Sequence, residues 1–244
     1  MEAYGRFYAR GELFEGYFKI ANGILDFEGL KFELKSVKFL PPVKPEKIVC
    51  VGLNYIDHAE ELNMEIPDEP VIFLKPPSSL VGHEDCVEIP ELPKGLNRVD
   101  YEGELAFIIA KKCKNVSAED FEDYILGYSC FNDVTARDIQ KIDGQWTRAK
   151  SFDTFACLGP YAVKIDPSNL KIETRLNGKV VQSSTTSNLI FNVGSLLEFI
   201  SEIMTLRRGD VIATGTPAGV GRVRRNDVVE VEIEGIGILR NKFV

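Results

Sequence analysis

The chain has 244 residues, which is enough for one large domain or for one domain with a small appendage. Its 29 lysines and arginines are outnumbered by 37 aspartates and glutamates, so the formal net charge is −8. Nucleic acids and anionic membranes select basic surfaces, and we therefore expect neither as a partner. Because the apolar runs are too short to cross a bilayer and the first residues lack a signal-peptide core, the sequence predicts a soluble, cytoplasmic protein.

The first 40 residues alternate apolar and polar side chains between glycine-containing turns. This pattern predicts short antiparallel strands. Pro41, Pro42 and Pro45 follow as a stiff connector. We therefore predict a small N-terminal β-rich domain over residues 1–45 and a second domain over residues 46–244.

Strand patterns dominate the rest of the chain, with few helices. Apolar runs predict strands over residues 47–53, 71–74, 210–214, 227–233 and 238–244. The Asn177-Gly178 pair predicts a two-residue turn in a hairpin over residues 171–182. Strands without regular alternation with helices favour a mostly β, α+β fold.

Two helices are predicted. The first would begin at Asn54, with Asp57 as its partner in a capping box, and run to about Met64. The second carries an apolar stripe over residues 193–204.

Five cysteines occur without a C-x-x-C pair, and their number is odd. Several, such as Cys50 and Cys157, have apolar neighbours in the sequence and are typical of reduced core residues. A nucleophilic cysteine with His58 as its base is the alternative, but no local motif singles one out.

Three carboxylates give the strongest indication of chemistry. Glu102 and Glu104 are two residues apart in an apolar run, so one face of a strand would carry both, about 6–7 Å apart. Asp133 ends the next apolar run, and a neighbouring strand would bring it beside the pair. Converging half-buried carboxylates repel one another and either take up protons or bind a cation. Oxygen ligands suit Mg²⁺, Mn²⁺ or Ca²⁺; the alternative is the solvated face of a strand.

The chain has two histidines, His58 and His83. His58 and Glu61 are three residues apart on the predicted first helix and share a face, so the carboxylate could orient the imidazole as a general base. The alternative is an ordinary solvated helix face. His83 is more typical of a loop histidine, and no role is assigned to it.

The glycine-rich segment 214–221 would expose backbone N–H groups, such as that of Gly215, to a substrate carboxylate or an enolate oxygen. The Thr216 hydroxyl would lie nearby. Its spacing matches no nucleotide-binding motif, and a plain structural turn is the alternative. Lys150, among apolar and small residues, could neutralise a substrate carboxylate or a developing enolate; the alternative is a surface lysine.

Taken together, these motifs resemble the fumarylacetoacetate hydrolase family. The resemblance covers residues 46 to about 234 and rests on six segments in the right order: residues 51–62, 73–77, 101–105, 132–138, 149–152 and 214–221. It is closest to the smaller acylpyruvase-like and 2-hydroxyhepta-2,4-diene-1,7-dioate isomerase-like members. Leu53 departs from the pattern, because acylpyruvases carry a basic residue there.

The resemblance implies a layered β-sheet roll with a few helices, in a homodimer. It implies Mg²⁺ or Mn²⁺ held by Glu102, Glu104 and Asp133. The helix with His58 and Glu61 resembles a lid whose His–Glu pair activates water. Substrate contacts are implied for Gln140, Lys150 and Thr216.

The sequence thus predicts a Mg²⁺- or Mn²⁺-dependent C–C bond hydrolase or decarboxylase acting on small 2-oxo acids, such as acylpyruvates or oxaloacetate. One alternative is an isomerase or tautomerase of 2-hydroxy-2,4-dienedioates, such as 2-hydroxyhepta-2,4-diene-1,7-dioate. Another, of a different class, is a protein that binds a metal and a carboxylate without turnover.

Overall fold

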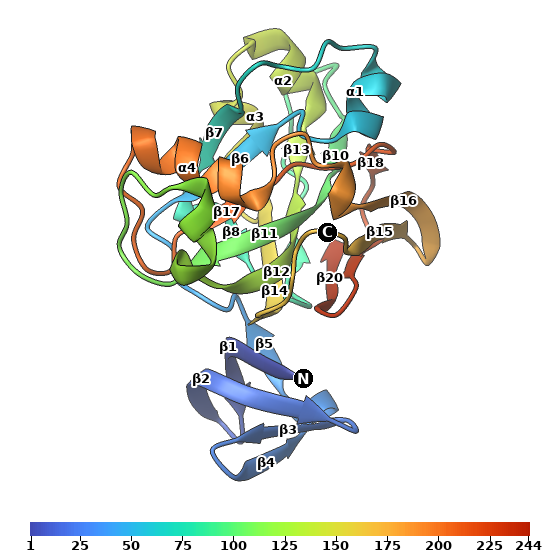
Figure 1. Ribbon diagram of the computed structural model, residues 1–244. Coiled ribbons are helices and arrows are strands. Elements are labelled where there is room, and N and C mark those ends of the chain that lie inside the picture. The colour runs from blue at the N-terminus through green and yellow to red at the C-terminus, as the bar shows by residue number, and fades with distance from the viewer.

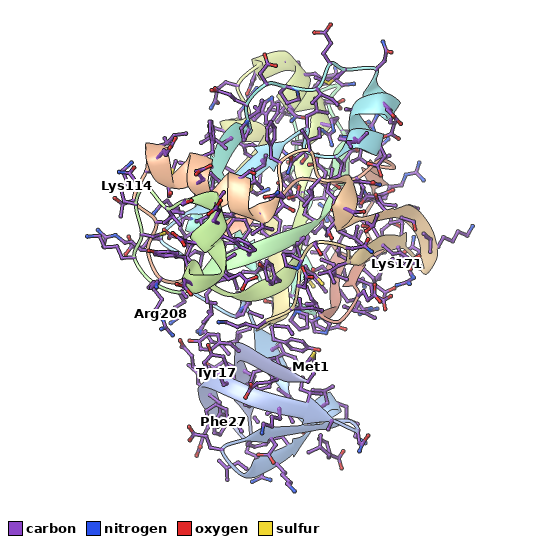
Figure 2. The ribbon with its side chains drawn as sticks, viewed as in Figure 1. Met1, Tyr17, Phe27, Lys114, Lys171 and Arg208 are labelled. Atoms are coloured by element: carbon purple, nitrogen blue, oxygen red, sulfur yellow. The ribbon has the colours of Figure 1, made fainter. Side chains whose placement is uncertain are left out.

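The computed structural model describes residues 1–244, with the side chain of Leu62 excepted. Figure 1 shows strands β1–β5 at the lower end of the molecule and helices α1 and α2 at the upper end. The N-terminal strands are β1 (Glu2–Ala9), β2 (Glu12–Ala21), β3 (Ile24–Phe27), β4 (Leu30–Glu33) and β5 (Lys38–Leu40). Met1, Tyr17 and Phe27 lie in this lower unit, far from α1 (Figure 2).

The alternation in β1 and β2 places aromatic side chains on the inner face of the N-terminal unit. Phe7 is fully buried, and its ring lies 5.2 Å from that of Phe14 and 5.5 Å from that of Phe18. The prediction of short antiparallel strands is therefore confirmed. Strand β1 joins the larger sheet where Tyr4 pairs with Ala162. The domain boundary near residue 45 stays a prediction.

The largest sheet runs in the order β4-β3-β2-β1-β14-β12-β11-β17-β6-β7. Its further members are β6 (Ile48–Gly52), β7 (Val71–Lys75), β11 (Gly103–Ile109), β12 (Ile125–Asp133), β14 (Ala156–Val163) and β17 (Val211–Ala213), with β8 (Leu80–Val81) paired to β14. Every residue of β11, β12 and β14 is buried, which explains why these strands are near-continuous apolar runs.

Two smaller sheets complete the strands. One has the order β13-β10-β18, and the other β16-β15-β19-β20-β9. Their bounds are β9 (Cys86–Val87), β10 (Val99–Tyr101), β13 (Thr135–Ala136), β15 (Lys171–Leu176), β16 (Lys179–Thr185), β18 (Gly221–Val223), β19 (Val228–Ile233) and β20 (Gly237–Phe243). The predicted hairpin is confirmed: Asn177 and Gly178 connect β15 to β16 with φ of 50° and 78°, as its turn requires.

The helices are short. They are α1 (Ile56–Leu62), α2 (Arg137–Asp143), α3 (Thr147–Lys150) and α4 (Val193–Ile203), with 3₁₀ turns η1 (Leu34–Ser36), η2 (Pro77–Ser79), η3 (Ala118–Tyr124) and η4 (Thr186–Asn188). Helix α4 confirms the apolar stripe, with Leu196, Leu197 and Ile200 fully buried. Strands outweigh helices, so the α+β prediction is confirmed. Among the described residues, no helix has the length and apolar character that a bilayer crossing needs.

Candidate active site

Glu102 lies at a break between two strands, not within one as predicted. Strand β10 ends at Tyr101 and β11 begins at Gly103, because β10 pairs with β13 and β18 while β11 pairs with β12 and β17. The Glu102 N–H donates to Asn132 Oδ1 at 3.0 Å, and its carbonyl accepts from the Asp133 N–H at 2.9 Å. The prediction that Glu102 shares a strand face with Glu104 is thus wrong, since the chain changes sheets at Glu102.

The structure nevertheless brings the three predicted carboxylates together. One oxygen each from Glu102, Glu104 and Asp133 lies within 4.8 Å of the others, and all three residues are buried. The register of β11 with β12, which pairs Gly103 with Asn132, accounts for this convergence. An oxygen-only donor set of this kind is what hard divalent cations prefer.

Three cationic side chains surround the carboxylates. Lys150 Nζ donates to Glu102 Oε2 at 2.9 Å and to Asp133 Oδ2 at 2.8 Å. Arg137 donates to the other oxygen of Glu102, and Lys75 Nζ donates to Asp133 Oδ1 and to the Val134 carbonyl. Lys75 and Lys150 are only 1% and 2% exposed, so the alternative of a surface lysine at position 150 is wrong.

Sequence reasoning assigned no role to Lys75. The signal was a single lysine at the end of the apolar strand that precedes Pro76 and Pro77. A lysine in such a strand is buried only when a carboxylate or a carbonyl receives its charge. Here Asp133 provides that partner.

The charges are distributed unevenly within this cluster. Burial raises the pKa of Glu102, but Lys150 and Arg137 outweigh it and lower that pKa to about 2. Burial, together with the charges of Asp133 and Glu102, raises the pKa of Glu104 well above its ordinary value. One Glu104 oxygen accepts the Gly215 N–H at 2.8 Å, a neutral donor. Glu104 is therefore the carboxylate of the three that lacks a cationic partner, and a divalent cation such as Mg²⁺ or Mn²⁺ would favour its ionised form.

Helix α1 carries the predicted histidine–glutamate pair. His58 Nδ1 lies 3.1 Å from Glu61 Oε2, and both Glu61 oxygens accept the Gly219 N–H at 3.2 Å. Asp57 Oδ2 accepts from the Ser184 hydroxyl at 2.5 Å, and its other oxygen accepts from the Ala218 N–H at 3.4 Å. Hydrogen bonds thus hold α1 against β16 and the glycine-rich loop.

The predicted capping box at the start of α1 is wrong. Tyr55 is the N-cap, with no side-chain capping bond, and Asp57 bonds across the fold as described above. The Asn54 side chain donates to the carbonyls of Phe191 and Thr214 and accepts from the Phe191 N–H. Asn54 therefore connects the start of α1 to two loops that are distant in the sequence. Its side chain satisfies the hydrogen-bonding needs of their backbone carbonyls and N–H group.

The glycine-rich loop directs its donors toward the protein's own carboxylates. Gly215 donates to Glu104, so the predicted contact of its N–H with substrate is replaced by one with a carboxylate of the site. The Thr216 hydroxyl donates to the Gly103 carbonyl at 2.9 Å and accepts from Gln182 Nε2 at 2.8 Å. The loop thus contacts the carboxylate strand at one end and α1 at the other.

A cavity of about 280 Å³ opens beside these groups. Its lining comprises Val51, Gly52, Leu53, His58, Met64, Phe73, Glu102, Glu104, Arg137, Gln140, Lys141, Trp146, Lys150 and Thr216. The Arg137 guanidinium donates to Gln140 Oε1 at 2.6 Å, which leaves the Gln140 amide N–H groups to face other partners. Leu53 contributes an apolar wall from a left-handed backbone with φ of 49°.

His83 lies elsewhere, in a groove of about 1260 Å³ that is also lined by Phe39 and Tyr161. Its Nδ1 accepts the Arg240 N–H at 3.2 Å. Burial lowers the pKa of His83, although the Glu84 charge opposes this effect. The structure therefore places His83 outside the candidate site, and the predicted satisfied loop histidine is confirmed.

Comparison with known proteins decides the family. Residues 47–244 match the family model described as fumarylacetoacetate (FAA) hydrolase, C-terminal. The chain belongs to the fumarylacetoacetate hydrolase family. The resemblance inferred from six sequence segments is thereby confirmed, and the protein is an enzyme.

Relatives in this family align along most of the chain. An uncharacterised protein of Archaeoglobus fulgidus is 63% identical over 98% of this chain and 95% of its own length. The mitochondrial oxaloacetate tautomerase of Xenopus laevis is 42% identical over 96% of this chain and 76% of its own length.

Solved structures of the fumarylacetoacetate hydrolase type superimpose along the whole chain. The 5-carboxymethyl-2-hydroxymuconate delta-isomerase from Mycobacterium smegmatis has a TM-score of 0.90 at 42% identity and covers 100% of this chain and 98% of its own. The 2-hydroxyhepta-2,4-diene-1,7-dioate isomerase from Mycobacterium marinum has a TM-score of 0.89 at 41% identity, with the same coverage. A maleylpyruvate hydrolase from Sphingobium, in complex with manganese(II) and pyruvate, has a TM-score of 0.83 at 27% identity, covering 100% and 99%.

Proposed function

We propose that this protein is a divalent-metal-dependent tautomerase or isomerase of small 2-oxo acids with a second carboxylate, such as oxaloacetate. One observation carries the proposal: His58, which Glu61 contacts, lines the same cavity as the cluster of Glu102, Glu104 and Lys150. A base on one side of the cavity and the charged cluster with Lys150 on the other suit the removal of a proton from the carbon next to a carbonyl group. The tautomerase and isomerase relatives, at 41–42% identity, support this order of preference over hydrolysis.

Glu102, Glu104 and Asp133 would hold Mg²⁺ or Mn²⁺, and the neighbour solved with manganese and pyruvate supports this assignment. When bound, the cation would act as a Lewis acid on the oxygens of the 2-oxo acid.

His58 is proposed as the base. Because the Glu61 carboxylate can only accept, Nδ1 of His58 carries the hydrogen between them, and Nε2 keeps its lone pair for a substrate proton. Glu61 then stabilises the imidazolium, and the Gly219 N–H holds Glu61 in place. Proton transfer of this kind contributes about 10²–10⁴-fold to a rate.

Lys150 is proposed to stabilise the developing enolate. Burial works to lower the pKa of this amine, but Asp133 and Glu102 outweigh it and raise the pKa, so Lys150 stays protonated. Its ammonium also lies 4.9 Å from the ring centre of Phe73, on the apolar side of the cavity. A fixed positive charge in a dry site is worth more to an enolate than the same charge in water.

Hydrolytic C–C cleavage or decarboxylation is the second candidate. The His58–Glu61 pair can also act as a base toward water, and the maleylpyruvate hydrolase neighbour supports this candidate. Decarboxylation of oxaloacetate needs the enolate stabilisation alone, so it would depend on Lys150 and not on His58.

The test is an assay of the purified chain with Mn²⁺ against enol-oxaloacetate and acetylpyruvate. Loss of enol absorbance without pyruvate supports tautomerisation, whereas pyruvate release supports cleavage. A chelator and the Glu104→Gln variant serve as controls for metal dependence. Tight Mn²⁺ binding without turnover on any 2-oxo acid would contradict both candidates and leave the non-enzymatic alternative. The homodimer and the cytoplasmic location stay predictions.

A further inference from the structure

We infer that Gln182, on β16, is a positioning residue for this site, acting on the metal-binding carboxylates through Gly103 and on the cavity through Thr216. Gln182 is 1% exposed and uses both halves of its amide. Its Oε1 accepts the Gly103 N–H at 3.0 Å, and its Nε2 donates to Thr216 Oγ1 and to the Pro217 carbonyl, both at 2.8 Å. The inference rests on the proposed function, which gives the positioned groups their roles.

The acceptor half of the amide holds the peptide between Glu102 and Glu104. Gly103 begins β11 directly after the change of sheet at Glu102, and a side chain there has no room: a Cβ atom would lie 2.0 Å from Thr174 Oγ1 and 3.2 Å from Gln182 Oε1. The bond from Gly103 to Gln182 therefore fixes the backbone from which two of the three carboxylates project. Support of this kind commonly changes metal affinity by about 10–100-fold.

The donor half of the amide sets the direction of the Thr216 hydroxyl. The amide cannot be reversed, since reversal would oppose its oxygen to the Pro217 carbonyl and its NH₂ to the Gly103 N–H. Thr216 accepts from Gln182 and donates to the Gly103 carbonyl, so its only hydrogen is used within the protein. Toward the cavity, Thr216 can therefore only accept a hydrogen bond. This favours a ligand hydroxyl group or a water molecule that can donate one.

Two substitutions separate these halves. Gln182→Glu keeps an acceptor for Gly103 and removes the donors to Thr216 and Pro217. Gln182→Met has a similar length and removes all three bonds. Asn241→Asp is the matched control, because Asn241 is also 1% exposed and its amide also joins two segments, donating to the carbonyls of Gly82 and Asp85.

The measurements are the Mn²⁺ dissociation constant of the full chain, by calorimetry or electron paramagnetic resonance, and kcat and KM on enol-oxaloacetate. For Gln182→Met we expect Mn²⁺ binding to weaken and kcat to fall by about 10–100-fold each, with KM within about 3-fold. For Gln182→Glu we expect an equal fall in kcat with Mn²⁺ binding unchanged or tighter. Asn241→Asp should change only the melting temperature.

A double-mutant cycle tests the route through Thr216. Thr216→Val and Gln182→Glu should each lower kcat, and the double variant should be no slower than the slower single variant. Additive losses would overturn the route through Thr216. If Gln182→Met and Asn241→Asp change Mn²⁺ affinity and kcat equally, the inference is wrong and Gln182 only stabilises the fold. If the wild-type chain shows no turnover, the proposed function fails, while the Mn²⁺ affinities still decide the role of Gln182: equal values for wild type and Gln182→Met overturn it.

Discussion

Glu104 differs from the other two carboxylates of the site in its partners. Glu102 and Asp133 each contact Lys150, and each has a second cationic partner, Arg137 or Lys75. Glu104 contacts the Gly215 N–H. A buried carboxylate without a full opposing charge is costly to keep ionised. Among the three carboxylates, Glu104 therefore contributes most to the binding free energy of a cation and most reduces the folding stability of the metal-free protein.

Glu104→Gln should therefore separate metal affinity from stability. The amide keeps the shape and removes the charge, so we expect Mn²⁺ binding to weaken by about 10²-fold or more, equivalent to about 2.7 kcal/mol. Without metal, the variant should melt at or above the wild-type temperature, because like-charge repulsion is relieved. Calorimetric titration with Mn²⁺ and thermal melts in a chelator check both parts. A lower melting temperature without metal would contradict this account of the cluster.

His58→Gln tests the base. We expect kcat on enol-oxaloacetate to fall by about 10²–10⁴-fold, since the proton acceptor is lost, while Mn²⁺ affinity stays within about 2-fold. Any oxaloacetate decarboxylation should be spared, because it needs no proton acceptor. Steady-state assays of both reactions on one preparation check this. Equal loss of the two activities would rule out the assignment of separate roles.

The loop from Thr214 to Gly219 joins the carboxylate cluster to helix α1. Gly215 has φ of +97°, and a Cβ atom there would lie 2.9 Å from the Asn54 side chain and 3.2 Å from the Val51 carbonyl. Gly215→Ala should destabilise the fold by about 1–3 kcal/mol through its backbone conformation, with the steric contact in addition. It should also weaken Mn²⁺ binding by about 5-fold or more, because the donor to Glu104 moves.

Gly178→Ala is the control for this loop substitution. Gly178 also has a positive φ, +78°, but an added Cβ would have no neighbour within 4 Å among the described atoms. It should cost about 1 kcal/mol and leave Mn²⁺ affinity unchanged. Denaturant melts and metal titrations of both variants make the comparison, and an equal effect on Mn²⁺ would count against the loop as a support of Glu104.

Helix α1 depends on the hydrogen bonds of Asp57 to Ser184 and Ala218. Asp57→Ala should reduce kcat/KM by about 5–30-fold, equivalent to about 1–2 kcal/mol, since the position of His58 becomes less favoured. Mn²⁺ affinity should not change. Glu60→Ala, an exposed position on the same helix, is the control, and an equal loss in that variant would disprove the attachment through Asp57.

Most strands, two of the helices, and the carboxylates and the His58–Glu61 pair could be predicted because local patterns specify them, whereas α2 and α3 were not predicted. The Asn177-Gly178 turn and the buried stripe of α4 follow from spacing within one element. The change of sheet at Glu102 could not be predicted, because it depends on which distant strands pair with residues on either side. Lys75, Gln182 and the true partners of Asn54 could not be predicted for the same reason, since each bonds to residues at least 34 positions away.

His83 links the unfolding free energy of the whole molecule to pH. Its pKa in the folded protein is below the ordinary value of 6.5, so the unfolded chain takes up a proton more readily than the folded chain. The stabilisation from neutral His83 is thus complete above about pH 6.5 and is lost as the pH falls through the lowered value. Protonation of Nδ1 would also remove the acceptor for the Arg240 N–H.

His83→Gln should keep an acceptor and remove this proton linkage. We expect the variant to lose less unfolding free energy than the wild type between about pH 8 and about pH 5.5. Denaturant unfolding at the two pH values, with Mn²⁺ removed from both samples, checks the difference. A pH dependence identical to that of the wild type would show that other groups account for the effect.

The loop that holds Glu104 through Gly215 and Glu61 through Gly219 has a consequence for how such an enzyme can be altered. Only three residues separate Gly215 from Gly219, and they set the distance between the carboxylate cluster and helix α1, so an insertion there would disturb both at once. The apolar wall of Leu53, Met64 and Trp146 lies outside that hydrogen-bonded connection. Different residues thus set the reactivity and the substrate selectivity. Redesign for a bulkier acid should therefore begin with substitutions in the apolar wall.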